Sequence, residues 1–399
     1  MRDAGRVLIA GAGPVGLAAA LRLAQLGVPV AVLEKRMQLG RVQRASAWLP
    51  PTLEVFEQLG ILDGVLRTGL RVRRIAYLGA GAGTVLARFD LGLLAGETRF
   101  PFRLHLDQGS VAAALAARLT AYPHVRLAFD AELVRVDQNA TGVAVRVRSA
   151  LGERVERGAY LLGADGIGSA VRACLGIGFT GVAAAGRLLQ VITPAELGEF
   201  VPLAEAASWI ETQGGWCGLL RMPDVWQIAL PLPDHVSGEA ALDEAALRAR
   251  LASCLPSGAA TLPLLAREVQ PVRRQVAGTY GAGRVLLAGD AAHLVQTRGG
   301  LNMNCGMHDA MAAAEALAAA LHRPAAGAPL ETYARERRLV ATGQLVPYAD
   351  RAVPGDAAST AGLRDAAADP ARARAWMRSA CMLDMPGFRA PVTGPGLPA

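Results

Sequence analysis

The sequence has few of the residues that build disulfide or zinc scaffolds. Its 399 residues include five cysteines, which are scattered along the chain without a CxxC pair. An odd number of separated cysteines argues against a disulfide framework, and the lack of close pairs argues against a structural zinc site. We therefore expect no bound metal and five reduced thiols, at Cys174, Cys217, Cys254, Cys305 and Cys381.

Long apolar runs are missing, although 52% of the residues are hydrophobic. No stretch of about 18 residues is free of Gly, Pro and charge, and no basic segment followed by an apolar stretch and a cleavage site opens the chain. We expect a cytoplasmic protein without stable membrane association.

Lysine is almost absent, since Lys35 is the only one, and the net charge of +7 comes from arginines spread along the whole chain. Because no basic block is interleaved with aromatic residues, we expect no nucleic-acid partner.

The first forty residues predict two parallel strands joined by a helix. Apolar runs at 6–10 and 29–34 are typical of buried strands, and the alanine-rich segment 14–26 between them is typical of a helix. The turn before the helix reads Gly-Ala-Gly-Pro-Val-Gly. This arrangement favours a nucleotide-binding unit.

Each residue of the glycine turn has a separate physical role. Gly11 permits the tight turn, Gly13 lets backbone N–H groups approach a pyrophosphate, and Gly16 lets the helix pack against the strand. The helix N-terminus adds about half a positive charge facing the phosphates. Glu34, at the end of the second strand, can accept hydrogen bonds from a ribose hydroxyl. The predicted adenine-dinucleotide site comprises Gly11, Gly13, Pro14, Gly16, Glu34, Lys35 and Arg36.

A second acid-and-glycine loop lies far along the chain. The strand predicted at 284–289 ends at Asp290, and Gly299 and Gly300 precede a long alanine-rich helix. An acid at a strand end can hydrogen-bond a polyol chain, which FAD has and NAD lacks, and paired glycines let the backbone lie close to a flat ring. The predicted flavin-end residues are Gly289, Asp290, Gly299, Gly300, Leu301 and Asn302. The two segments together favour FAD.

The remaining pattern predicts a mixed α/β chain. We expect helices at 51–60, 107–122, 299–321 and 329–343, and strands at 71–78, 84–90, 125–129, 131–137, 143–148 and 159–163. The strands at 71–78 and 84–90 form a predicted hairpin. Between about 178 and 280, tryptophan, proline and isolated strand-like segments predict an inserted sheet domain.

Three motifs in order carry a resemblance to a known family. They are GAGPVG with Glu34, GADGIGSAVR at 163–172, and AGDAAH at 288–293 leading to GGLNMNCGMHDA. On these motifs the chain resembles the FAD-dependent aromatic hydroxylases, which are the p-hydroxybenzoate hydroxylase-like group A flavoprotein monooxygenases. The resemblance implies a Rossmann-type FAD-binding domain with an inserted, mostly β-sheet substrate domain and C-terminal helices.

The domain boundaries follow from this resemblance and the composition. We expect a discontinuous FAD-binding domain at 1–177 and 281–345, with a small hairpin insertion near 71–105. The substrate-binding sheet domain would cover 178–280, and a helical segment with a tail would cover 346–399.

The resemblance adds three cofactor-binding residues. Asp165, in the middle motif, matches the family's acid beside the pyrophosphate channel. Arg44 matches an arginine that reaches the FAD pyrophosphate, and Gln108 matches a residue that contacts the ribityl chain. No catalytic base is identified.

The reaction implied is hydroxylation of a small aromatic or polycyclic, polyketide-like substrate. NADH or NADPH would bind transiently and reduce FAD, O2 would add at the flavin C4a, and the hydroperoxide would transfer oxygen to an electron-rich ring. Substrate would lie between the inserted sheet and the flavin, in a monomer or homodimer. Candidate lining residues are Trp209, Trp216, Arg221 and Trp226.

Two departures from the family loop leave alternatives open. The family usually has a proline before the glycine pair, where this chain has Gln-Thr-Arg at 296–298, and a glycine two residues before Asn304, where this chain has Asn302. One alternative is an FAD-dependent reductase or oxidase of the same superfamily. The other is a flavin-binding scaffold without turnover of its own.

Overall fold

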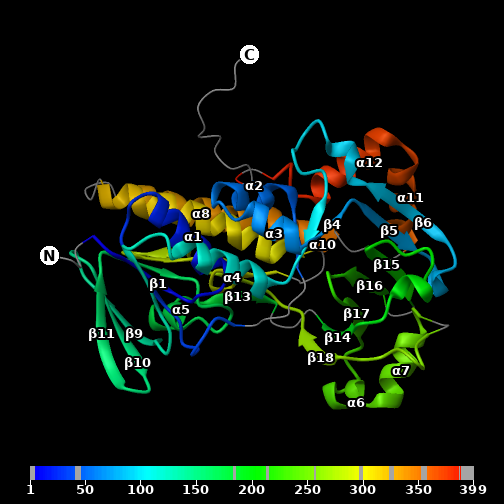
Figure 1. Cartoon of the computed structure of the whole chain (residues 1–399), viewed down its shortest axis with the longest axis horizontal. Coiled ribbons are helices and arrows are strands. Elements are labelled where there is room, and N and C mark those ends of the chain that lie inside the picture. The colour runs from blue at the N-terminus through cyan, green and yellow to red at the C-terminus, as the bar shows by residue number, and fades with distance from the viewer. Residues whose placement is uncertain are drawn as a thin grey trace.

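The computed structural model describes residues 5–40, 46–182, 186–212, 215–255, 258–295, 300–322, 328–351, 357–385 and 387. Two regions lie side by side in Figure 1. One holds a mostly parallel sheet covered by helices, and the other holds a larger, mostly antiparallel sheet flanked by helices at the chain's C-terminal end.

The first region is built around a six-stranded sheet in the order β20-β21-β12-β1-β2-β8. Five of its strands pair in parallel, and β20 pairs antiparallel at one edge. The central strands are buried throughout, as parallel strands covered on both faces require. The strands are β1 (Val7–Ala10), β2 (Val30–Leu33), β8 (Val125–Ala128), β12 (Tyr160–Gly163), β20 (Gly281–Ala282) and β21 (Val285–Leu287).

Helices α1 (Pro14–Gln25), α4 (Gln108–Leu119) and α8 (Leu301–His322) pack together in this region. The predicted strand-helix-strand unit is therefore confirmed. An antiparallel sheet of β9 (Glu132–Gln138), β10 (Val143–Ser149) and β11 (Gly152–Gly158) lies beside it, and α5 (Ala170–Cys174) packs on β9.

The second region is a seven-stranded sheet in the order β18-β14-β17-β16-β15-β5-β6. It contains β14 (Arg187–Thr193), β15 (Ala207–Thr212), β16 (Gly215–Arg221), β17 (Trp226–Leu232) and β18 (Ala266–Pro271), with α6 (Gly238–Leu242) and α7 (Glu244–Ala252).

The predicted hairpin forms β5 (Arg74–Leu78) and β6 (Val85–Asp90), but it extends this second sheet. Ile75 pairs in parallel with Ala207 on β15. The hairpin predicted as a small insertion near 71–105 thus forms one edge of the second sheet. Local alternation predicts a hairpin but carries no information on the distant strand with which that hairpin pairs.

The structure also contains two short sheets, neither of which was expected. The first contains β3 (Ala47–Trp48), β7 (Arg103–His105) and β4 (Leu70–Val72), with β7 in the middle. The second contains β13 (Phe179–Val182), β19 (Arg274–Ala277) and β22 (His293–Leu294). Strands this short give too little alternation to be recognised in a sequence.

The remaining helices cover the outside. They are α2 (Pro50–Gln58), α3 (Leu62–Thr68), α9 (Ala328–Val340), a π turn (Ala341–Leu345), α10 (Val346–Arg351), α11 (Ala357–Ala368) and α12 (Pro370–Ala380). Trp376 of α12 stacks on Phe89 of β6 with ring centroids 3.9 Å apart, so the C-terminal helices brace the second sheet. In the part of the chain that the structure describes, no helix combines the length and apolar character needed to cross a membrane.

Candidate active site

The turn between β1 and α1 accepts only glycine at two positions. Gly11 has φ +100°, and a Cβ on it would lie 2.4 Å from the carbonyl oxygen of Ala164. A Cβ on Gly16 would lie 2.0 Å from the carbonyl oxygen of Gly11. Gly13 differs, because a Cβ there would meet nothing within 4 Å. Gly13 therefore leaves space for a ligand to approach the backbone.

A cavity of about 410 Å3 opens at this turn. Helix α1 begins at Pro14 without a side-chain cap, so its first N–H groups can bind an anion. Glu34 is 7% exposed, and its carboxylate accepts hydrogen bonds from the N–H groups of Ala12 and Arg36 at 2.8 and 3.0 Å. Uncapped amides, open space and a fixed carboxylate fit the phosphates and ribose of a dinucleotide. The predicted residues that line this cavity are Gly11, Gly13, Pro14, Glu34, Lys35, Arg36, Gln108, Asp165 and Asp290.

Asp165 stabilises the helix next to this cavity. Its carboxylate accepts hydrogen bonds from Ser169 Oγ at 2.6 Å and from the Val171 N–H at 3.1 Å. The acid therefore orders the start of α5 while it lines the cavity wall. Gln108, the first residue of α4, also lines this cavity, and its Nε2 donates to Ser46 Oγ at 2.9 Å.

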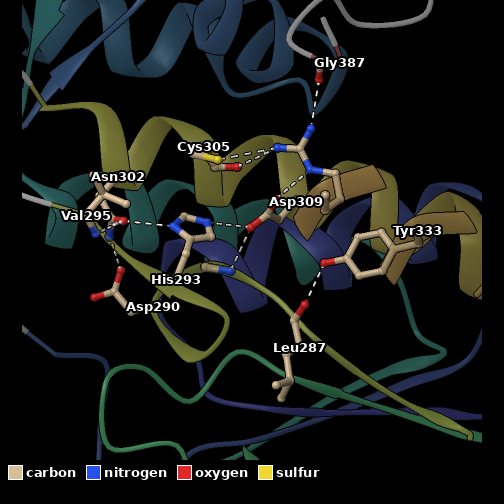
Figure 2. Close-up of polar contacts among 11 residues, drawn as sticks. Leu287, Asp290, His293, Val295, Asn302, Cys305, Asp309, Tyr333 and Gly387 are labelled. Atoms are coloured by element: carbon tan, nitrogen blue, oxygen red, sulfur yellow. Dashed lines mark hydrogen bonds and ion pairs between the residues drawn. The ribbon is translucent and has the colours of Figure 1, made fainter. Parts of the chain in front are cut away.

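A hydrogen-bonded chain runs from Asp290 into the protein interior (Figure 2). Asn302 Nδ2 donates to Asp290 Oδ1 at 2.6 Å, and Asn302 Oδ1 lies 2.9 Å from His293 Nδ1. His293 Nε2 lies 2.8 Å from Asp309 Oδ2, and Arg337 Nε donates to Asp309 Oδ1 at 2.7 Å. We call these five residues the buried relay. It links the 290 loop to α8 and α9.

The geometry of the relay requires a doubly protonated His293. The amide oxygen of Asn302 accepts from the Val295 N–H at 3.0 Å, while its NH2 group donates to Asp290, so the amide orientation is fixed. His293 then faces an acceptor at each ring nitrogen and must donate from both.

The pKa directions agree with this geometry. Burial disfavours the charged imidazole, but Cys305 and Asp309 beside it raise the pKa of His293 well above its ordinary value. Burial also opposes ionisation of Asp309, yet Arg337 and His293 lower the pKa of that carboxyl to about 2. Asp309, Cys305 and His293 lie close enough together to hold a metal ion. The Arg337 guanidinium already occupies the carboxylate, however, so the cluster is an ion-pair network.

A second cavity of about 190 Å3 lies between the seven-stranded sheet and the 290 loop. It shares Gln108, Asp290 and Met303 with the larger cavity. A molecule in the second cavity would therefore lie directly beside one end of a ligand in the first.

Two of the four candidate lining residues reach this second cavity. Trp209 and Trp216 line it, and both pack on Tyr77 with ring centroids 5.2 and 5.6 Å away. Arg221 and Trp226 are not among its lining residues. Their side chains instead hydrogen-bond the Glu196 carboxylate.

The other predicted residues lie in three kinds of place. Gly16 and Gly289 are buried next to the cavities, and Leu301 packs in an apolar cluster that includes Leu49 and Cys305. Gly300 and Asn302 line the second cavity. Arg44 and Gly299 lie outside the described residues.

Sequence reasoning missed Arg103 and His105, which also line the second cavity. The only sequence signal for a polar site here was a pair of basic residues at alternate positions in the otherwise apolar segment 102–106, Phe-Arg-Leu-His-Leu. The relay residues Asp309 and Arg337 were missed because their partners are distant in sequence.

The chain belongs to a flavoprotein family. The sequence model described as "FAD binding domain" matches residues 5–346, which is most of the chain.

Similar proteins of known activity make the class more specific. The para-nitrophenol 4-monooxygenase of Pseudomonas sp. (strain WBC-3) is 29% identical over 344 residues, covering 84% of this chain and 83% of that protein. A Streptomyces rimosus enzyme, 12-dehydrotetracycline 5-monooxygenase/anhydrotetracycline 6-monooxygenase, is 31% identical, covering 85% of this chain and 67% of that protein. The crystal structure of p-nitrophenol 4-monooxygenase PnpA from Pseudomonas putida DLL-E4 superposes with a TM-score of 0.88 at 27% identity, covering 96% and 98% of the two chains.

The predicted fold class and cofactor are confirmed. The chain is an FAD-dependent oxidoreductase of the monooxygenase type, with the p-hydroxybenzoate hydroxylase-like fold.

Proposed function

We propose that the chain uses NADH or NADPH and O2 to hydroxylate a single-ring phenol. The observation that carries this proposal is the small chamber of about 190 Å3, lined by Trp209 and Trp216, that meets the larger cavity at Gln108, Asp290 and Met303. Pockets for drug-sized ligands typically hold roughly 300–1,000 Å3, so this chamber suits one ring better than a polycycle. A relative that acts on para-nitrophenol supports the same choice.

The residues of the larger cavity would hold FAD in an extended pose. The N–H groups at the start of α1 would bind the pyrophosphate, and Glu34 would accept from the adenosine ribose. Asp290, oriented by Asn302, would accept from the ribityl hydroxyls near the second chamber. Bound FAD supplies electron transfer from the nicotinamide to O2 and oxygen transfer to the ring.

The protein's own part in the reaction is positioning and exclusion of water. Trp209 and Trp216 present flat apolar surface to an aromatic ring, and Gln190, Gln227 and Gln270 contribute neutral amides from neighbouring strands of the same sheet. A ring held between this sheet and the 290 loop would lie next to the cofactor's reactive end in a largely dry space.

The test is rapid-mixing kinetics on the FAD-loaded chain with NADH or NADPH and a panel of aromatic compounds. A single-ring phenol should accelerate flavin reduction, and under air the product should gain one oxygen atom by mass. Turnover without O2 to a hydrogenated product would instead identify a reductase. A flavin that neither nicotinamide reduces, with any ligand, would identify a scaffold.

A further inference from the structure

Strand β7 places two basic side chains on one face. Arg103 and His105 are separated by one residue, so both leave the same side of the strand, and both line the second cavity. Leu104, between them, packs into the core of the first region. β7 is the central strand of its sheet, so its backbone is held by β3 and β4 on either side.

Arg103 is a buried cation that has no carboxylate partner in the described parts of the chain. It is 5% exposed, and its Nη2 donates to the carbonyl oxygen of Ala380 at 3.0 Å. Among the described residues, its Nε has no hydrogen-bond partner and no acid forms an ion pair with it. A buried charge that is not compensated strongly destabilises a fold. An anionic ligand in the adjoining cavity would supply the missing compensation.

His105 has one ring nitrogen, Nε2, that accepts no hydrogen bond from any described residue. It is fully buried, and Nδ1 lies 2.8 Å from the carbonyl oxygen of Arg221. A carbonyl only accepts, so Nδ1 carries the hydrogen, and Nε2 is left with a lone pair that has no partner in the part of the chain that the structure describes. Burial lowers the pKa of His105 to about 4. The hydrogen bond to the Arg221 carbonyl opposes this shift, and the nearby charge of Arg103 adds to it. The free imidazole is therefore neutral at neutral pH.

We propose that His105 Nε2 accepts the proton of the substrate's ring hydroxyl and that the Arg103 guanidinium holds the oxygen that results. The proton moves from the hydroxyl oxygen to Nε2. The electron pair of the broken O–H bond stays on that oxygen, which becomes a phenolate between two cations. The increased electron density at the ring carbons then favours electrophilic oxygen transfer.

The assignment rests on the proposed function, because it concerns the substrate of the same site, and it narrows that substrate to an acidic phenol. Asp290 is the one carboxylate among the described residues that line the chamber, and it is already hydrogen-bonded to Asn302 at the edge shared with the larger cavity. Arg103 is therefore the positive charge on the β7 side of the chamber, and the glutamine amides that line it are uncharged.

The first test compares two probes on the FAD-loaded protein, 4-nitrophenol and its methyl ether 4-nitroanisole. The ether has the same ring but no proton to release. We expect the phenol to bind at least tenfold more tightly, and its difference spectrum to be that of the phenolate at a pH where the free compound is still largely protonated. Equal affinities, or a bound spectrum of the neutral phenol, would overturn the assignment.

Variants of the two residues sharpen this test. Arg103→Met should reduce the preference for the phenol about 10- to 100-fold, and Arg103→Lys should restore part of it. His105→Phe should abolish the phenolate spectrum, whereas His105→Gln should weaken it. All four variants should retain bound FAD. A variant set with an unchanged phenol-to-ether ratio would contradict the roles of both residues.

Thermal unfolding of the ligand-free protein separates this role from a structural one. Removing an uncompensated buried charge should leave the Tm of Arg103→Met unchanged or higher, whereas a structural arginine would lower it when lost. The outcome is also distinct from that of the proposed function. If the phenol preference were present but no oxygen were transferred, the function would fail and the binding assignment would stand.

Discussion

Asn302 stands where the family usually has glycine, and the structure gives its side chain three hydrogen bonds. The amide contacts Asp290, His293 and the Val295 backbone. A glycine could make none of these side-chain contacts, so this departure connects Asp290, the predicted ribityl acceptor, to His293 within the buried relay. It orients Asp290 and does not obstruct the site.

At the residue scale, Asp290→Ala should lower FAD affinity about 10- to 100-fold. The reason is the loss of charged hydrogen bonds to the ribityl chain, which contribute about 1.5–3 kcal/mol. Titration of the apoprotein with FAD, followed by flavin fluorescence, measures the change. Glu34→Ala should also weaken FAD while leaving the apoprotein folded. Full, tight flavin in the Asp290 variant would reject its assignment.

The charge on His293 predicts a pH dependence of stability. Its pKa is raised above the ordinary 6.5, so its contribution is complete below pH 6.5 and is lost as pH rises through the folded-state value. The free energy of unfolding should fall by about 1.4 kcal/mol per pH unit over that interval. Urea unfolding of the apoprotein between pH 6.5 and roughly 8.5, below the ordinary thiol and phenol range, measures the slope.

The matched variants for this prediction are His293→Gln and His322→Gln. His293→Gln should remove the fall in the free energy of unfolding at alkaline pH, because the glutamine carries no proton to lose. The second changes an exposed histidine at the end of α8 and should leave the decline as it is. A decline that persists unchanged in His293→Gln would show that another group titrates.

At the scale of single elements, the glycine turn before α1 separates folding from cofactor binding. Gly13→Ala adds a methyl group where nothing lies within 4 Å, so the apoprotein should unfold at the same temperature as the parent while FAD binds more weakly. Gly16→Ala places a Cβ 2.0 Å from the Gly11 carbonyl oxygen and should destabilise the fold itself. Calorimetry with and without FAD distinguishes the two variants, because it measures the unfolding temperature of the apoprotein and its increase when FAD binds. Unaltered FAD affinity in Gly13→Ala would mean that the cofactor does not pass this turn.

The relay also joins helices α8 and α9 through Asp309 and Arg337. Asp309→Asn should lower the free energy of unfolding by about 3–5 kcal/mol, because it leaves Arg337 and His293 as buried charges without a counter-ion. The control on the same helix is Glu315→Gln, which breaks a partly exposed pair with Arg22 and should cost less than about 1 kcal/mol. Similar losses in the two variants, measured by denaturant unfolding, would show that burial does not strengthen the inner pair.

At the scale of the whole molecule, the fold brings distant segments to one place. The larger cavity is formed by the glycine turn near residue 11, the start of α4 at 108, the loop at 165 and the loop at 290. The second cavity uses β7, the seven-stranded sheet and the same 290 loop. Two chambers that share a wall suit a reaction in which cofactor and substrate must meet while water is excluded.

The sequence predicts the parts of this arrangement that are encoded locally. The glycine spacing at 11–16, the buried strand before it and the acid at 290 are set by neighbouring residues, so their structural context could be recognised. The pairing of Ile75 with Ala207 depends on strands 132 residues apart (207 − 75), and no local pattern reports it.

The same limit applies to the substrate chamber. Trp209 and Arg221 are both on strands of the second sheet, yet only Trp209 reaches the cavity, because Arg221 pairs with Glu196. Arg103 and His105 resemble ordinary strand residues until the tertiary structure buries them and leaves Arg103 Nε and His105 Nε2 without a hydrogen-bond partner among the described residues. Burial and lost partners are properties of the folded chain, so these two residues could be identified only there.

The most direct measurement of the central claim is the origin of the oxygen in the product. The FAD-loaded chain would be supplied with NADH or NADPH and an acidic phenol under 18O2, and the product examined by mass spectrometry. We predict a product heavier by one 18O atom, formed in step with nicotinamide oxidation. A hydroxylated product carrying oxygen from water, or nicotinamide oxidation that releases only hydrogen peroxide with every phenol tested, would contradict the account.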